Sequence, residues 1–374
     1  MKLALLILLI PSIHLTANYL FIQWWIGATL LSIPCGYFVY KRTSMWLGLF
    51  FSYVVSYFAY IAYSHTGRFI NIPQHDKVSY VAISAATVLI MFLFVVGLSS
   101  LKKKHLETLI SAIPYYGVIN ALYVCIGYLF KFGKLTNSMG YSGFLENSSL
   151  NSNLIAYSLV YILCTRAFSK QRALLAVPCL CAIFLSRSSI AYGILATGIT
   201  AYWFSERVFK KEVFLKVAGI FTAIICIGFL TEGYELFDSA KRLEAYSLFL
   251  SHWQVNYPNM FGSGPGTFAI LSPGISRAHK FMVSGDTIWL WHWMHSEFLQ
   301  ELFQTGWLGF TLIVGAVLDL AWKLFKSHNS LLLALFLSVV GGAVFNFPAR
   351  YFPIAFVSAI IIAACYRSID LRER

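Results

Sequence analysis

Apolar residues in this chain form long runs, and the polar residues gather in short clusters between them. A run of roughly 20 apolar residues is the length of a helix that crosses a bilayer. The pattern predicts an all-α, polytopic membrane protein with about 12 transmembrane helices. The expected spans are 3–20, 23–40, 45–63, 79–98, 109–130, 152–168, 173–186, 189–205, 216–230, 297–321, 330–346 and 352–366.

Within this layout we expect a single integral membrane domain, 1–374. One long outer loop, 231–295, separates the ninth span from the tenth. The region 173–205 is divided into two short spans that meet at Ser186–Ser188, which leaves almost no loop between them. The apolar segment at the N-terminus lacks a small-residue cleavage site, so it is interpreted as a retained first span.

The long loop is predicted to contain an amphipathic helix over 239–253. Its apolar residues recur at helical spacing, and Asp238 or Ser239 is the expected cap. They are Leu243, Tyr246, Leu250 and Trp253. The glycines and Pro265 that follow are expected to end any helix. The aromatic segment 289–293 is expected at the membrane interface.

Composition supports lipid as the solvent for this chain. Of its residues 59% are hydrophobic and 11% are charged, whereas a soluble domain carries about a quarter charged residues. The net charge of +13 would suggest nucleic acid in a soluble protein. Here the positive residues lie in short clusters between apolar runs, which is a signal of membrane topology. We therefore expect membrane lipids and no nucleic acid as partners.

The distribution of lysine and arginine predicts the orientation. With the N-terminus in the cytoplasm, 18 of the 28 positive residues lie inside, which predicts that both termini are cytoplasmic. The ten on the periplasmic side oppose this bias, so each needs a reason, either solvation of a loop or an anionic ligand. They are Arg68, Lys77, Lys131, Lys134, Arg187, Lys241, Arg242, Arg277, Lys280 and Arg350.

Metal and cofactor chemistry is not expected. All seven cysteines lie in apolar runs without the spacing of a zinc site, and they are interpreted as small buried hydrophobes. The periplasmic segments contain no Asp-x-Asp pair of the kind that many metal-dependent glycosyltransferases use. We expect no cofactor and no divalent metal.

His295 is the candidate catalytic base, because it lies where the long loop re-enters the membrane. A histidine there can take a proton from a hydroxyl near neutral pH. The alternative is an interfacial histidine that water or backbone satisfies. Glu297 and Glu301 follow on the same helix face, and a carboxylate near a histidine can orient it.

Three of the outside arginines are candidate anion ligands. Arg187 lies at the tight turn between two spans, where a guanidinium is costly unless it is paired or bound. Arg242 lies on the predicted loop helix, and Arg350 follows the penultimate span. Guanidinium groups match phosphate oxygens in a bidentate manner. The alternatives are an interface anchor or structural ion pair for Arg187, a solvated face for Arg242 and an interface anchor for Arg350.

The glycine segment of the loop has two interpretations. Gly262, Gly264 and Gly266 could offer backbone N–H groups to a phosphate. The favoured interpretation is a tight turn that lets the loop lie on the membrane. A dinucleotide site is excluded, because no strand precedes the segment and Pro265 interrupts it.

Several of these motifs together resemble the bacterial O-antigen ligase and O-antigen polymerase superfamily. The strongest match is the run from His295 to Gly309, in which Ser296 stands where the family commonly has Asn. The others lie at 258–268, 185–188 and Arg242, with a weaker one at Gly143-Phe144 followed by Asn151 and Asn153. The matches extend from about residue 140 to 350.

The resemblance implies transfer of a glycan from undecaprenyl diphosphate to an acceptor hydroxyl on the periplasmic face. His295 would be the general base, and Arg187 and Arg242 would bind the diphosphate. Gly262, Gly264, Glu297 and Arg350 would have supporting roles. Inversion at the sugar carbon is expected.

Three functions stay open. A ligase would transfer the glycan to lipid A-core, and we favour it slightly because this compact twelve-span layout is typical of the family's ligases. A polymerase would transfer it to another lipid-linked glycan. A transporter or flippase of an anionic lipid or solute would also use arginines within the membrane, but would need inverted repeats with broken helices.

Overall fold

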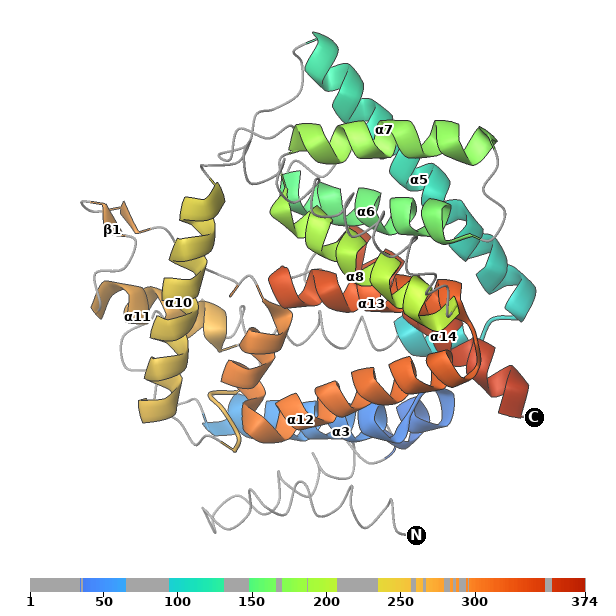
Figure 1. Cartoon of the computed structure of the whole chain (residues 1–374). Helices are drawn as coiled ribbons and strands as arrows, with labels where there is room; N and C mark the ends of the chain where they lie inside the picture. The colour runs from blue at the N-terminus through green and yellow to red at the C-terminus, as the bar shows by residue number, and fades with distance from the viewer. Residues whose placement is uncertain are drawn as a thin grey trace. The chain divides into compact units, whose positions relative to one another are not determined.

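The computed structural model describes residues 34, 36–64, 94–130, 148–165, 170–186, 188–206, 235–256, 260–264, 267–278, 283–284, 287–288, 294, 296–346 and 352–373. Nearly all of them are helical, so the prediction of a helical protein is confirmed (Figure 1). One small exception is the antiparallel pairing of β1 (Val283–Ser284) with β2 (Thr287–Ile288) in the long loop. The chain forms two compact units, one of Met1–Val96 and Glu244–Asp319, the other of Gly97–Leu243 and Leu320–Arg374.

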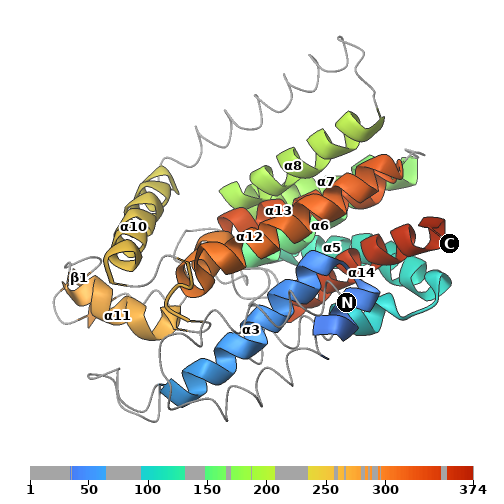
Figure 2. The ribbon, with the colours of Figure 1, turned by 90° about the horizontal axis from the view of Figure 1, so that it is seen from below.

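The second unit is a helix bundle. Its helices are α5 (Lys103–Phe130), α6 (Ser148–Cys164), α7 (Lys170–Ser186), α8 (Ser189–Glu206), α13 (Ser330–Phe345) and α14 (Phe352–Glu373). Helix α6 packs against each of the other five, and it lies beside α8 and α13 (Figures 1 and 2). The predicted division of 173–205 into two short helices is confirmed, because α7 ends at Ser186 and α8 begins at Ser189.

Small residues let these helices approach closely. A Cβ atom added to Gly341 of α13 would lie 2.9 Å from the Thr197 hydroxyl of α8. A Cβ atom added to Gly198 of α8 would lie 3.0 Å from the side chain of Val160 on α6. Close contact through small residues is typical of helices that pack in a membrane.

Hydroxyl groups inside the bundle bond to their own helices. Ser186, Thr197 and Ser338 each donate to the carbonyl oxygen four residues earlier, at 2.7, 2.7 and 2.8 Å. Such bonds satisfy a polar side chain without water.

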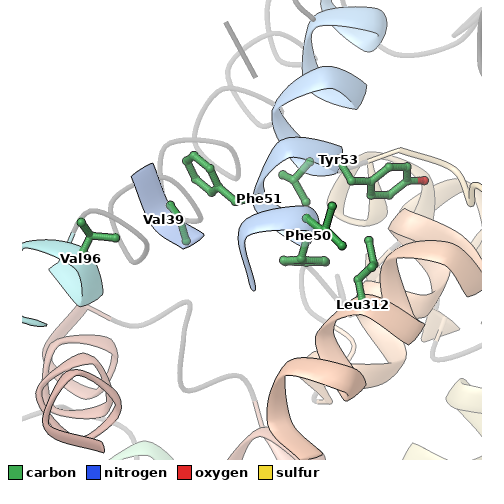
Figure 3. Packing of buried hydrophobic residues seen from close by; sticks show 8 residues of the cluster. Val39, Phe50, Phe51, Tyr53, Val96 and Leu312 are labelled. Atoms are coloured by element: carbon green, nitrogen blue, oxygen red, sulfur yellow. The ribbon is translucent and has the colours of Figure 1, made fainter. Parts of the chain in front are cut away.

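The first unit contains α3 (Met45–Ser64), the greater part of α10 (Glu235–Asn256), α11 (Phe268–Ala278) and most of α12 (Glu297–Lys326). One apolar cluster joins α3 to α12, where Leu312 points toward Phe50 (Figure 3). The ring of Trp46 packs against Gly315, where an added Cβ atom would lie 2.7 Å from the ring. A second cluster joins α10, α11 and the start of α12.

Two helices of the described residues, α5 and α12, are long and apolar enough to cross a membrane. Shorter apolar helices occur at Met45–Val55, Ser149–Cys164, Ser330–Val344 and Pro353–Ile369. The expected spans 3–20 and 216–230 lie outside the described residues, as does the aromatic segment 289–293. Of the spans 23–40 and 79–98, helix is described from 36 and from 94.

One expectation for the long loop was wrong, and one of its helices was not predicted. Helix α10 begins at Glu235, so Asp238 and Ser239 lie inside it and neither is its cap. Helix α11 was not predicted, and it contains Pro273 and Gly274, the two residue types with the lowest helix propensity. Its apolar residues Phe268 and Ile275 are nevertheless buried, and this packing outweighs the low helix propensity of proline and glycine.

Candidate functional site

The candidate site is built on the start of α12, where α10 and α11 support it. Phe268 of α11 is buried between two aromatic neighbours in edge-to-face geometry. Its ring centroid lies 4.9 Å from that of Phe249 on α10 and 5.4 Å from that of Phe303 on α12. Aromatic pairs of this kind add about 0.5–1.5 kcal/mol to the burial itself. The turn at 260–264 is thereby held between α10 and α11, against α12.

Gly262 in this turn lies directly against Gly306 of α12. A Cβ atom on Gly262 would lie 2.5 Å from the Gly306 nitrogen, and one on Gly306 would lie 2.5 Å from the carbonyl carbon of Met260. Both glycines have positive φ, 73° at Gly262 and 66° at Gly306. At Gly306 ψ is −170°, a conformation that is essentially restricted to glycine. Only glycine fits at either position.

Gly306 breaks α12 into two helical parts, and the turn satisfies the groups that the break releases. The Ser263 N–H donates to the Phe303 carbonyl at 2.9 Å, and the Gly264 N–H donates to the Gln304 carbonyl at 2.7 Å. In return the Leu308 N–H donates to the Met260 carbonyl at 3.1 Å. The N–H of Gly264 is therefore used within the protein, and this glycine supports the site through backbone geometry.

A tyrosine of α3 secures the same crossing. The Tyr53 hydroxyl lies 3.0 Å from the Thr305 carbonyl and 3.3 Å from the Phe261 carbonyl, so one buried group contacts both sides of the crossing. A buried carbonyl without a partner costs about 1–3 kcal/mol. Tyr53 thus ties α3 to the turn and to the break in α12.

The backbone on both sides of position 295 is anchored to the first turn of α12. The side-chain oxygen Oε1 of Gln300 accepts a hydrogen bond from the Met294 N–H at 3.0 Å, and Gln300 is buried. Ser296 acts as the N-cap, since its Oγ lies 3.4 Å from the Leu299 nitrogen and its carbonyl accepts from the Gln300 N–H at 3.0 Å.

Two carboxylates lie in the first two turns of α12. Glu297 and Glu301 are four residues apart, so they share a helix face, and each is only 9% exposed. Carboxylates are almost never so buried unless they are paired. Glu297 lies in the first turn, where the helix dipole favours a negative charge.

No protein-family model and no curated protein matches this chain.

The predicted site residues divide into two groups. Gly262, Gly264 and Glu297 are described, and the structure brings the two glycines together with the helix that carries Glu297. Outside the described residues lie His295, Arg187 and Arg350. The Arg242 position lies on α10, but its side chain is also outside what is described.

The positions beside the undescribed residues are nonetheless informative. Met294 and Ser296 flank His295, and both are buried. Ser186 ends α7 and Ser188 immediately precedes α8, so Arg187 occupies the connection between these helices. Asn346 is the C-cap of α13, four residues before Arg350.

Sequence reasoning gave no role to three residues that hold the site together, Tyr53, Gln300 and Gly306. Gly306 was recognisable as an isolated glycine in a helical pattern, which often has a packing reason. Gln300 lies in the run from His295 to Gly309 that carries the strongest match of the resemblance, but no role was predicted for its side chain, and Tyr53 left no signal. Each acts through a bond to the backbone of a distant or non-helical segment, and such bonds follow no periodicity.

Proposed function

We propose first that this chain is a multi-span membrane protein. The support is an apolar stripe along α5 that no described part of the protein covers. Its members recur at spacings of three and four residues, while the opposite face of the helix is buried. They are Tyr115, Ile119, Leu122, Ile126 and Leu129. In water such a stripe would be a large exposed apolar patch, whereas lipid is its natural neighbour.

Within that membrane we propose a glycosyltransferase of the O-antigen ligase kind. It would transfer a glycan from undecaprenyl diphosphate to a hydroxyl of lipid A-core on the periplasmic face of the bacterial inner membrane. The acceptor oxygen attacks the anomeric carbon, the bond from that carbon to the phosphate oxygen breaks, and undecaprenyl diphosphate leaves. The acceptor proton passes to His295.

One observation carries this proposal. The glycine turn and the segment after His295 are two separate motifs of the resemblance, about 40 residues apart in sequence, and they pack together through Gly262 and Gly306. A chance likeness of two degenerate motifs gives no reason for such contact. The two residues beside His295, Met294 and Ser296, are both anchored to the first turn of α12, which supports the proposal because a general base must be held in position.

The remaining roles follow from charge. Arg187 and Arg242 would bind the diphosphate and stabilise the leaving group as its charge develops. Arg350 would add positive charge, and Glu297 would help to orient the imidazole. Because the arginines supply the positive charge, the proposed reaction uses no metal. Direct displacement with one base implies inversion at the anomeric carbon.

The break in α12 is the feature that a transporter would share, because discontinuous helices line many transport sites. In such sites the freed carbonyls coordinate the transported ion. Here the carbonyls before the break are already occupied. Those of Phe303, Gln304 and Thr305 accept from Ser263, Gly264 and Tyr53 respectively. This favours a structural role for the break and therefore the enzyme over the transporter.

The experiment that tests the proposal is deletion of the gene in its native host, followed by gel analysis of the envelope glycolipids. A ligase predicts that full-length polymer accumulates on the carrier lipid and is lost from the core. Single repeat units capped on the core would instead indicate the polymerase, which joins lipid-linked glycans. If neither pattern changes, the proposed class of reaction is wrong.

A further inference from the structure

Two buried asparagines, Asn153 of α6 and Asn346 at the end of α13, lie at the same end of the bundle in the second unit. Their position along the bundle follows from the contacts between α6, α8 and α13. A Cβ atom on Gly342 of α13 would lie 2.7 Å from the Tyr157 hydroxyl of α6 and 3.4 Å from Ile194 of α8. One helical turn further toward the start of α6 is Asn153, and one turn further toward the end of α13 is Asn346.

A second level of contacts fixes the direction of the helices. Gly198 of α8 faces Val160 of α6, with an added Cβ atom 3.0 Å from that side chain, and Ser338 of α13 lies at the same level. From the first level to the second, residue numbers increase along α6 and α8 and decrease along α13, so α6 and α8 are parallel and α13 is antiparallel to both. The start of α6, the start of α8 and the end of α13 therefore share one end of the bundle, and Ser188 at the start of α8 belongs to that end.

Several polar atoms at this end have no hydrogen-bond partner among the described residues. Both side-chain atoms of Asn153, Nδ2 and Oδ1, lack a hydrogen bond, as do Nδ2 of Asn346 and Oγ of Ser188. All three residues are at most 1% exposed. Ser188 is particularly informative, because a serine just before a helix ordinarily caps it with its hydroxyl, and this one does not.

Elsewhere in the bundle some comparable groups are satisfied, although Nδ2 of Asn151 and Oγ of Ser358 also lack a hydrogen bond. The hydroxyls of Ser186 and Ser338 donate to carbonyls of their own helices. Leaving buried amides unbonded is costly, so such groups call for a bound water, an ion or a ligand. Asn153 decides the chemistry, since it offers a donor and an acceptor together. A phosphate only accepts hydrogen bonds and would leave Oδ1 unsatisfied, whereas a sugar hydroxyl or acetamido group bonds to both atoms.

We propose that Asn153 and Asn346, with Ser188 beside them, form a neutral hydrogen-bonding site for a sugar residue of the substrate glycan. The inference rests on the proposed function and adds to it neutral groups that bind the sugar, distinct in chemistry from the arginines proposed for the diphosphate. It makes these residues determinants of glycan preference.

The test uses the full-length chain in lipid nanodiscs and two probes. One probe is undecaprenyl diphosphate alone, and the other is the undecaprenyl-diphosphate glycan extracted from the native host. Affinities are measured for the wild type, for Asn153→Leu with Asn346→Leu, and for Asn346→Leu alone. The control is Ser338→Ala, which removes a buried but satisfied hydroxyl from the same helix as Asn346. The melting temperature of each variant is measured in parallel.

Wild type and control should bind the glycan-bearing probe about tenfold more tightly than the bare diphosphate, the value of one or two hydrogen bonds. The double variant should lose this preference and keep its affinity for bare undecaprenyl diphosphate. Its melting temperature should not fall, because leucine has a similar volume and leaves no unbonded amide. Asn346→Leu alone should lose part of the preference.

Two results would overturn the inference and leave the proposed function standing. In the first, both the double variant and Asn346→Leu keep the wild-type preference for the glycan-bearing probe. The asparagines would then bind only water. The other is a wild type that binds both probes equally. If the wild type binds neither probe, the proposed function fails, and the inference fails with it.

Discussion

Gly262 and Gly306 pack so closely that neither can carry a side chain, since a Cβ atom on Gly262 would lie 2.5 Å from the Gly306 nitrogen. Both also have positive φ. Gly306→Ala is therefore expected to lower the free energy of unfolding by at least about 1–3 kcal/mol through backbone strain alone. The collision of the new Cβ atom with the backbone of Met260 adds to this loss. The amount of folded protein in detergent and its melting temperature measure this loss. Gly262→Ala should behave in the same way.

Gly274→Ala is the matched control for these substitutions. Gly274 lies inside α11 in the same unit, with no atom within 4 Å of an added Cβ and no positive φ. Alanine there should leave stability unchanged or raise it by about 0.5–1 kcal/mol. Equal melting temperatures for Gly306→Ala and Gly274→Ala would show that the glycine crossing does not support the fold.

Tyr53→Phe is expected to destabilise the first unit by about 1 kcal/mol. The substitution removes the hydroxyl that contacts the carbonyls of Phe261 and Thr305 but keeps the buried ring. Tyr37→Phe is the control, because Tyr37 is 48% exposed. Thermal unfolding of both variants compares a buried with an exposed hydroxyl. A loss as large in Tyr37→Phe would refute the special role of Tyr53.

Gln300→Leu is expected to lower kcat for glycan transfer by about 10–100-fold, with KM little changed. The change removes the acceptor for the Met294 N–H and so frees the backbone beside His295, while small displacements of a catalytic group carry losses of this size. Gln300→Glu keeps an acceptor oxygen and should retain most of the activity. Steady-state kinetics on nanodisc protein separate the two parameters. A rise in KM alone, or no rescue by glutamate, would contradict positioning.

The apolar stripe of α5 is expected to face lipid. Spin labels at Ile119 and Ile126 should be quenched readily by oxygen and poorly by a water-soluble nickel complex. Labels at Ile113 and Val124, which are buried, should be accessible to neither. The native cysteines are replaced before labelling. Ready access of the nickel complex to position 119 would mean that the stripe faces water, and the membrane proposal would fail at this helix.

Helix positions were largely predictable because the apolar runs of this chain are long and end at polar clusters. The expected ranges 189–205 and 330–346 differ by one residue at one end from α8 and α13. The start of α6 at Ser148 was placed four residues too late. Polar residues fill its first turns, and Asn151 and Asn153 are buried in spite of their polarity.

The packing of the long loop was much less predictable. Of the expected apolar face of its first helix, Trp253 is buried and Tyr246 and Leu250 pack against the same cluster, but the buried Phe249 was not expected there. The side chain of Leu243 lies outside the described residues. A glycine turn can also be recognised in sequence without revealing what it packs against. The partner of Gly262 is 44 residues away in a broken helix, and the positive φ that it needs leaves no periodic signal.

The central claim is that His295 is the base in a glycan transfer from undecaprenyl diphosphate. The most direct measurement is transfer by purified protein in nanodiscs, with lipid-linked glycan from the native host as donor and lipid A-core as acceptor. Wild type and His295→Ala are compared at equal melting temperature and equal donor affinity. The account predicts product from the wild type and a loss of at least about 100-fold in His295→Ala. Transfer at the wild-type rate by the folded variant would contradict it.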